Sequence, residues 1–204
     1  MIVRLRRLLA IGLFYQAVLS SGCGGEGEQH SIHFIVSAVM TPTYNGVDTN
    51  SVDAFRATCT NSSGATQPEY FADHMATASI YASLIDPRDQ QIVYIDAYTI
   101  DYLSSADSPG APLIQSDTRA NSISFGVSSA TPTLAATVTL ELVDLIRKNE
   151  YTADVKSAPS YLNNYAATYT FKGHNRSGAP FTFTSRTNFQ IGPFNYCPPG
   201  FQPM

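Results

Sequence analysis

One short stretch of the sequence gathers oxygen-bearing side chains that could bind a metal ion. Asp48, Asn50 and Asp53 lie within six residues of one another, and two of them are carboxylates. Calcium takes about six to eight oxygen ligands, which is the donor type offered here. The stretch lacks the glycine and the distal glutamate of a known calcium-binding loop, and short polar residues also cap turns. A weak calcium site and a capped turn therefore both remain open.

No motif of a familiar catalytic site occurs in the sequence, which has no GxSxG, HExxH, P-loop or GxGxxG pattern. His30 and His33 would share one face of a helix, but on a strand they point to opposite faces. We therefore expect no cofactor and no enzyme activity. The alternative is an active site, or an enzyme-accessory surface, that is assembled in three dimensions from loops 45–74 and 104–119.

The first 22 residues form a targeting segment rather than part of the fold. An arginine-rich start precedes an apolar run, residues 8–19, that is too short for a stable transmembrane helix. The small residues Ser20, Ser21 and Gly22 then lead into Cys23. An ordinary signal peptide that is cut nearby is the simpler alternative.

This start resembles the lipobox signal of bacterial lipoproteins, in which the cysteine is acylated and the segment before it is removed. Ser20 departs from that motif, which prefers leucine there. The resemblance implies lipid attachment at Cys23, with residues 23–30 as a tether. Gly24, in place of aspartate, resembles an outer-membrane sorting signal. We expect a protein anchored by lipid to the bacterial outer membrane, facing the periplasm or the cell surface.

The charge of the chain excludes some partners. The net charge is −4, with 12 basic and 16 acidic residues. Removal of residues 1–22 takes away three arginines and makes the remainder more acidic. An acidic chain is repelled by nucleic acid and by anionic lipid headgroups. Membrane attachment is therefore expected through acyl chains on Cys23, of which two or more hold firmly.

Two cysteines remain once Cys23 is assigned to lipid. An exported chain enters a compartment that permits disulfides, so Cys59 and Cys197 are expected to form one bridge. Two free buried thiols are the alternative. The bridge would close a loop of about 140 residues, for which chain entropy gives an upper figure of roughly 5 kcal/mol.

The strand that organises the fold is expected at residues 90–105, which are rich in Tyr, Ile, Val and Thr and contain no Gly or Pro. Tyr98, Ile100 and Tyr102 share one face and are predicted core residues. The same alternation places Ile92 and Tyr94 on that face, and places Asp96 and Asp101 on opposite faces.

Further strands are predicted from alternating apolar residues at 30–44, 75–85 and 120–129, and a hairpin at 165–191. Residues 136–146 fit either a helix face or a strand, and their β-branched start favours a strand. Residues 45–73 are predicted to be a long decorated loop, and residues 147–164 a loop with one helical turn. The expected fold is all-β, an antiparallel sandwich of seven or eight strands over residues 31–192, with a tail at 193–204.

The segment Tyr98-Thr99-Ile100-Asp101-Tyr102 is similar to the Tyr-x-Val-x-Tyr core motif of fibronectin type III and related immunoglobulin-like domains. A hydrophobic strand and a proline-containing turn precede it, as in that family. The family's tryptophan is absent, and the domain is nearly twice the usual length. The resemblance therefore implies an immunoglobulin-like architecture and no chemistry.

The regular strands and the absence of catalytic motifs together favour a binding or structural module of an envelope assembly. Binding sites on sandwiches lie in loops. Aromatic residues in predicted loops, namely Tyr70, Phe71, Tyr151 and Tyr161, are therefore the expected contacts for a protein or glycan partner. A calcium-stabilised adhesion module is a further alternative.

Overall fold

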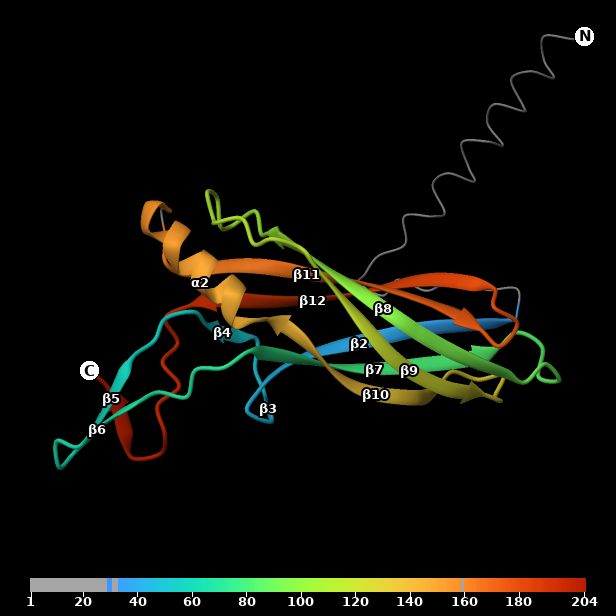
Figure 1. Cartoon of the computed structure of the whole chain (residues 1–204), viewed down its shortest axis with the longest axis horizontal. Helices are drawn as coiled ribbons and strands as arrows, with labels where there is room; N and C mark the ends of the chain where they lie inside the picture. The colour runs from blue at the N-terminus through green and yellow to red at the C-terminus, as the bar shows by residue number, and fades with distance from the viewer. Residues whose placement is uncertain (1–28, 31–32, 159) are drawn as a thin grey trace, which may run out of the picture.

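Seven long strands with alternating apolar residues build two sheets that pack face to face in the computed structural model, which describes residues 29–30, 33–158 and 160–204 (Figure 1). The first sheet has the order β1-β2-β7-β10, with β3 paired to β2, and the second has the order β4-β12-β11-β8-β9. The bounds of these strands are β1 Gln29–His30, β2 Phe34–Tyr44, β3 Val47–Asp48, β4 Ser51–Asp53, β7 His74–Leu84, β8 Gln91–Ser104, β9 Asp117–Val127, β10 Thr133–Val143, β11 Asn163–Asn175 and β12 Pro180–Gly192. The all-β prediction is confirmed.

The core pairs small residues on the first sheet with aromatic residues on the second. Strand β7 turns Ala76, Ala78 and Ala82 inward, and each is buried as its alternation predicted. The aromatic side of the core is buried too, and it consists of Tyr165, Tyr169, Phe171, Phe181, Phe183 and Phe189. Small residues opposite large ones let the two sheets interdigitate at the density that protein interiors require.

Strand β8 contains a β-bulge that the alternation did not predict. Pairing of β8 with β9 shifts register between Ile95 and Ala97. Val93 and Ile95 are buried before the bulge, whereas Tyr98 and Ile100 are buried after it, because one extra residue reverses which side chains face the core.

The bulge confirms part of the predicted face and corrects the rest. Tyr98 and Ile100 are core residues, and Tyr102 is partly buried with its hydroxyl donating to the Leu142 carbonyl at 2.5 Å. Ile92 is instead exposed, and Asp96 and Asp101 both face solvent rather than opposite sides of the sheet.

The ambiguous segment is a strand followed by a helix. Strand β10 runs over Thr133–Val143, as its β-branched residues favoured, and helix α2 covers Leu145–Asp154 before a short 3₁₀ turn at Val155–Ser157. Asp144 caps α2 by accepting from the Arg147 amide at 2.8 Å. The predicted single turn is thus a helix of ten residues. Within the described ranges, no helix has both the length and the apolarity that crossing a membrane requires.

The predicted loop at 45–73 holds four short strands. Strand β4 pairs parallel with β12, which departs from the predicted antiparallel pattern. Strands β5 (Thr58–Asn61) and β6 (Thr66–Pro68) form a hairpin, and β13 (Phe201–Pro203) from the predicted tail pairs with β5. These three strands make a small third sheet that projects from the body (Figure 1).

The elaborated segments gather at one end of the molecule. Strand β2 begins at the end where the turns between β7 and β8 and between β11 and β12 lie, since Phe34 pairs with Leu84 (Figure 1). We call this the tether end, because β1, where the described chain begins, pairs with Ile35 and Val36 of β2 here. The small sheet, helix α2 and the 105–116 loop lie at the opposite, distal end (Figure 1).

Candidate functional site

A groove of about 590 Å³ opens at the distal end between the β2–β3 turn and the segment that leads to β13. The turn is tight: Asn45 and Gly46 have φ values of 49° and 76°, which the Asn-Gly pair adopts readily. Aromatic, proline and small polar residues line what we call the tyrosine groove, namely Tyr44, Asn45, Val47, Asp48, Thr49, Tyr70, Tyr196, Cys197, Pro198 and Pro199.

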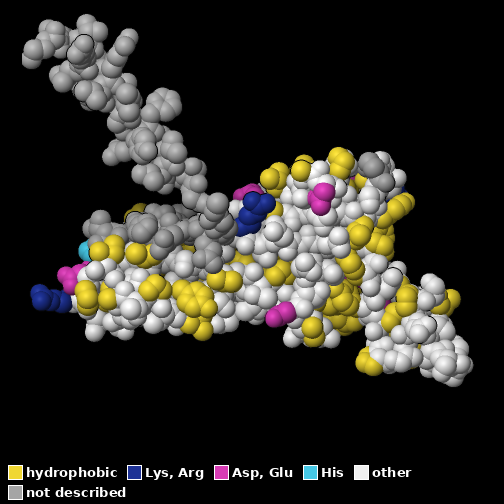
Figure 2. Space-filling view, turned by 180° about the vertical axis from the view of Figure 1, so that it is seen from behind, with side chains coloured by type: hydrophobic (Ala, Val, Ile, Leu, Met, Phe, Trp, Pro, Cys, Tyr) yellow, Lys and Arg dark blue, Asp and Glu magenta, His cyan; other side chains and the backbone are white. Residues whose placement is uncertain are grey.

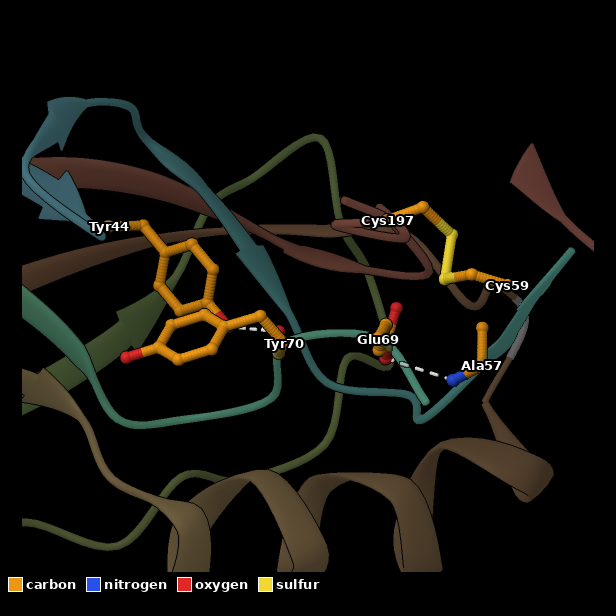
Figure 3. Close-up of a disulfide and its surroundings, with 6 residues drawn as sticks. All are labelled: Tyr44, Ala57, Cys59, Glu69, Tyr70 and Cys197. Atoms are coloured by element: carbon orange, nitrogen blue, oxygen red, sulfur yellow. Dashed lines mark hydrogen bonds between the residues drawn. A yellow bond between two sulfur atoms is a disulfide. The ribbon is translucent and has the colours of Figure 1, made fainter. Parts of the chain in front are cut away.

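Three tyrosines form the floor and one wall of the tyrosine groove. The Tyr44 ring lies 4.4 Å from the Tyr196 ring and 5.5 Å from the Tyr70 ring, measured between centroids. The Tyr44 hydroxyl donates to the Tyr70 carbonyl at 2.5 Å and accepts from the Ala72 amide at 3.2 Å (Figure 3). The Tyr196 hydroxyl donates to the Ser51 carbonyl. These bonds fix the rings of Tyr44 and Tyr196.

A disulfide holds the opposite wall. Cys59 of β5 and Cys197 are bonded, with Cα atoms 5.7 Å apart, which confirms the predicted bridge (Figure 3). The bond places Pro198 and Pro199 beside the tyrosines. Because the prolines have a fixed φ and the bridge anchors the residue before them, this wall has little freedom to move.

Behind the tyrosines lies a buried histidine. His74 stacks on the Tyr44 ring with centroids 5.2 Å apart, and its Nε2 bonds the Thr49 carbonyl at 3.0 Å. Burial lowers the pKa of His74 to about 4, so the ring is neutral near pH 7. A neutral ring can pack flat against tyrosine without a desolvated charge, and it thereby supports the floor of the tyrosine groove.

Lys148 of α2 is also fully buried, which is rare for lysine. Its ammonium donates to the Ala72 carbonyl at 2.6 Å and lies over the rings of Phe71 and Tyr44, at 4.7 Å and 5.3 Å from their centroids. Burial lowers its pKa to about 8, while nearby carboxylates, Asp53 foremost, oppose that shift. The helix is thus joined to the groove through a cation held between aromatic faces.

Two buried carboxyls face each other beside this lysine. Asp53 Oδ1 accepts from the amides of Phe55 and Phe194, both at 3.2 Å, and Glu69 Oε1 accepts from the Ala57 amide at 2.9 Å (Figure 3). If both were ionised, Asp53 Oδ2 and Glu69 Oε2 would have no donor, whereas a proton on one lets the carboxyls bond each other.

Burial accordingly raises the pKa of both carboxyls, that of Glu69 to about 7, and the neighbouring Asp53 charge adds to the shift in Glu69. We call Asp53 and Glu69 the carboxyl pair. Both side chains are buried and their oxygens hold backbone amides, so the pair fastens chain segments together behind the groove rather than facing a substrate.

The predicted calcium ligands do not come together. Asp48 and Asn50 are exposed, whereas Asp53 is completely buried in the carboxyl pair. In the described part of the chain, carboxylates gather instead at Asp117, Glu141 and Asp144, within 4.8 Å of one another.

Two arginines neutralise that second group. Arg119 contacts all three carboxylates, and Arg147 contacts Asp117 at 3.2 Å and Asp144 at 2.7 Å. Guanidinium groups therefore occupy the positions that a cation would take. This cluster joins β9, β10 and α2 as an ion-pair network.

The predicted aromatic contacts separate into groups. Tyr70 lines the groove and is 51% exposed, while Phe71 beside it packs under Lys148. Tyr161 is 53% exposed and touches the Phe55 ring edge outside the groove lining. Tyr151 is a correction: it lies in helix α2, is buried, and donates to the carbonyls of Tyr161 and Ile191, so it packs the helix onto the sandwich.

Sequence reasoning missed Tyr44 and Tyr196, because one ends a strand and the other lies in a presumed tail. A usable signal was the run Tyr196-Cys197-Pro198-Pro199, where the predicted bridge had to hold an aromatic residue and two prolines against the body. Cys23 and the targeting segment lie outside the described residues, so their roles remain predictions.

The face seen in Figure 2 shows few charged side chains, and hydrophobic ones gather where the small sheet projects from the body. No protein-family model, no curated protein and no solved structure matches the chain.

Proposed function

We propose that this chain is a lipid-anchored envelope protein that binds a partner in the tyrosine groove. The observation that carries the proposal is the position of this groove. It lies at the distal end, whereas the described chain begins with β1, which pairs with the start of β2 at the tether end. A module held to a membrane at one end would present the groove away from that membrane.

The order of the strands supports an immunoglobulin-like architecture for this module. In chain order β2, β7 and β10 share one sheet, and β8, β9, β11 and β12 share the other, with β11 between β8 and β12. Fibronectin type III domains have the same arrangement of seven strands. The motif Tyr98 to Tyr102 lies on β8, the third of these long strands, as it does in that family.

The construction of the groove favours binding. Tyr44 and Tyr196 are fixed by hydrogen bonds to the backbone, and the proline wall is fixed by the disulfide. Pre-ordered side chains lose little conformational entropy when a ligand binds, so more of the contact energy appears as affinity. The small number of polar groups among apolar walls is typical of ligand sites.

Capture of the partner from membranes tests the proposal. The tagged full-length chain is purified from detergent-solubilised membranes, and co-purifying components are identified by mass spectrometry. Tyr70→Ala removes an exposed groove side chain, and Tyr161→Ala is the matched control outside the lining. We expect Tyr70→Ala to lose a component that Tyr161→Ala retains. Equal recovery by both variants and the parent would contradict the proposal.

A further inference from the structure

We infer that the ligand of the tyrosine groove is an extended, proline-rich peptide segment that carries a basic residue. This inference rests on the proposed function and specifies its ligand. Three features of the groove support it: the burial of the Tyr44 ring, the free hydrogen-bond donors in the lining, and the charge at the rim.

The Tyr44 ring offers no open face to a ligand. Tyr44 is 4% exposed, with His74 stacked on it and the Tyr196 ring at 4.4 Å. A sugar ring binds aromatic residues by lying flat on an open face, which Tyr44 does not provide. A proline ring is smaller and can pack against Tyr70, which is 51% exposed in the groove. Grooves lined by tyrosine and proline are the usual sites for polyproline II segments.

Free donors complete the match to such a segment. A polyproline II chain has no internal hydrogen bonds and leaves its carbonyls unpaired, while its prolines have no amide hydrogen to satisfy. The Tyr70 hydroxyl and the Asn45 side-chain amide are exposed at the groove, and no other described residue accepts from either. Both can donate to carbonyls on the passing ligand.

The rim of the groove selects for positive charge. Asp48 is exposed in the lining, and it forms no ion pair with another described residue. The chain as a whole is acidic, with a net charge of −4. A carboxylate at a rim adds specificity and speeds association with an oppositely charged ligand more than it adds affinity. An arginine or lysine next to the prolines fits this position.

The rigidity of both sides makes the pairing favourable. The groove wall is held by the Cys59–Cys197 bond, and a polyproline segment is already extended before it binds. Neither partner must be ordered at the moment of binding, so a short contact suffices for measurable affinity. We expect a dissociation constant on the order of 10–500 µM for a single short segment.

Titration of the purified, detergent-solubilised full chain with synthetic ligands tests the inference. The probes are a decaproline peptide with one arginine, the same peptide with glutamate in place of arginine, a glycine–serine peptide with one arginine, and an N-acetylglucosamine hexamer. Binding is followed by calorimetry and by amide chemical shifts. The arginine–proline peptide should bind and should shift groove residues, and the glutamate version should bind at least threefold more weakly at low salt.

Variants identify the site and the charge. Tyr70→Ala should weaken binding of the arginine–proline peptide at least tenfold, and Tyr161→Ala should leave it unchanged. Asp48→Asn should make the arginine and glutamate peptides bind alike. Added salt should weaken binding of the arginine peptide until its affinity approaches that of the glutamate peptide, because salt screens the rim charge.

The outcomes separate this inference from the proposed function. Equal binding of the glycine–serine peptide, or groove shifts caused by the sugar alone, overturns the proline assignment while leaving a binding groove in place. No binding by any probe, together with Tyr70-dependent capture from membranes, also overturns the ligand class alone. Failure of both experiments overturns the proposed function as well.

Discussion

Asp53 and Glu69 are neighbouring buried carboxyl groups, and together they hold amides from two separate segments of the chain. One segment is the connection between β4 and β5, and the other follows β12, so the pair fixes the base from which the small sheet projects. The two carboxyls can bond each other only when one of them carries a proton, because two ionised carboxylates have no hydrogen-bond donor between them.

Replacement of Glu69 by glutamine should remove a pH dependence. Burial raises the pKa of Glu69 from 4.5 to about 7, so between these values the folded chain holds a proton that the unfolded chain releases. This contribution to stability is complete below pH 4.5 and is lost as the pH rises to about 7. Glutamine keeps an acceptor for the Ala57 amide and a permanent donor to Asp53.

His74 makes the comparison of variant with parent necessary. Its pKa is lowered from 6.5 to about 4, so the unfolded chain binds more protons in that window, and stability falls as the pH drops through it. The two effects oppose each other in the parent. The difference in unfolding free energy between Glu69→Gln and the parent should therefore rise by about 1–3 kcal/mol from pH 4.5 to 7.5 in urea titrations. A difference that is flat with pH rules out the shared proton.

Replacement of Lys148 by methionine should destabilise the fold. The change leaves the Ala72 carbonyl without its donor and the carboxyl pair without its nearby positive charge. We expect a loss of about 2–4 kcal/mol of unfolding free energy at pH 7. Lys156→Met is the matched control, because Lys156 is exposed, and it should change stability by less than about 0.5 kcal/mol. Similar effects of the two variants would show that the buried ammonium is not needed.

Removal of the disulfide should affect the groove more than the sandwich. The variant with serine at both Cys59 and Cys197 frees the proline wall and the small sheet, while the two large sheets keep their own core. We expect a loss of about 2–5 kcal/mol of stability, an unchanged β-sheet circular dichroism spectrum, and loss of partner capture. Full capture by this variant would contradict the role assigned to the proline wall.

Cys23→Ser should release the protein from membranes, because the lipobox-like start predicts acylation there. Membrane fractionation measures the release, and mass spectrometry of the N-terminal peptide measures the attached lipid. The variant with serine at Cys59 and Cys197 is the control for loss of cysteine as such, and it should stay with the membranes. A Cys23→Ser protein that still sediments with membranes and carries as much lipid would refute the anchor.

Local periodicity predicted the strands well because each strand has one apolar side. The buried alanines of β7 and the aromatic hairpin of β11 and β12 lie where their alternation placed them. Strand β10 followed from the β-branched residues at its start. These features follow from residues two positions apart in the sequence, so the sequence alone is enough to predict them.

The bulge in β8 could not be predicted in the same way. From Ile92 to Ile95 both faces of the strand are apolar, so the sequence does not show which of the two alternating sets of side chains faces the core. The extra residue between Ile95 and Ala97 is set by pairing with β9 and β11, which are distant in the chain. A change of phase of this kind depends on tertiary pairing.

The site was predictable only in part. Counting cysteines was enough for the Cys59–Cys197 bond, and Tyr70 was expected as a contact and lies in the groove. Tyr44 and Tyr196 meet because β12 pairs with β4 and the disulfide holds Cys197 to β5, contacts between residues that are far apart in the chain. Asp53 stood out as a metal ligand, yet its partner is Glu69, and no spacing rule links a buried carboxyl to the one that shares its proton.

The most direct measurement of the central claim is site-specific crosslinking in intact cells. A photo-crosslinking amino acid is placed at Val47, which is 65% exposed in the groove, or at Leu134, which is 57% exposed near the tether end of β10. The account predicts a discrete protein adduct from position 47 that Tyr70→Ala abolishes, and no adduct from position 134. Equal adducts from both positions, or an adduct from position 134 alone, would contradict it.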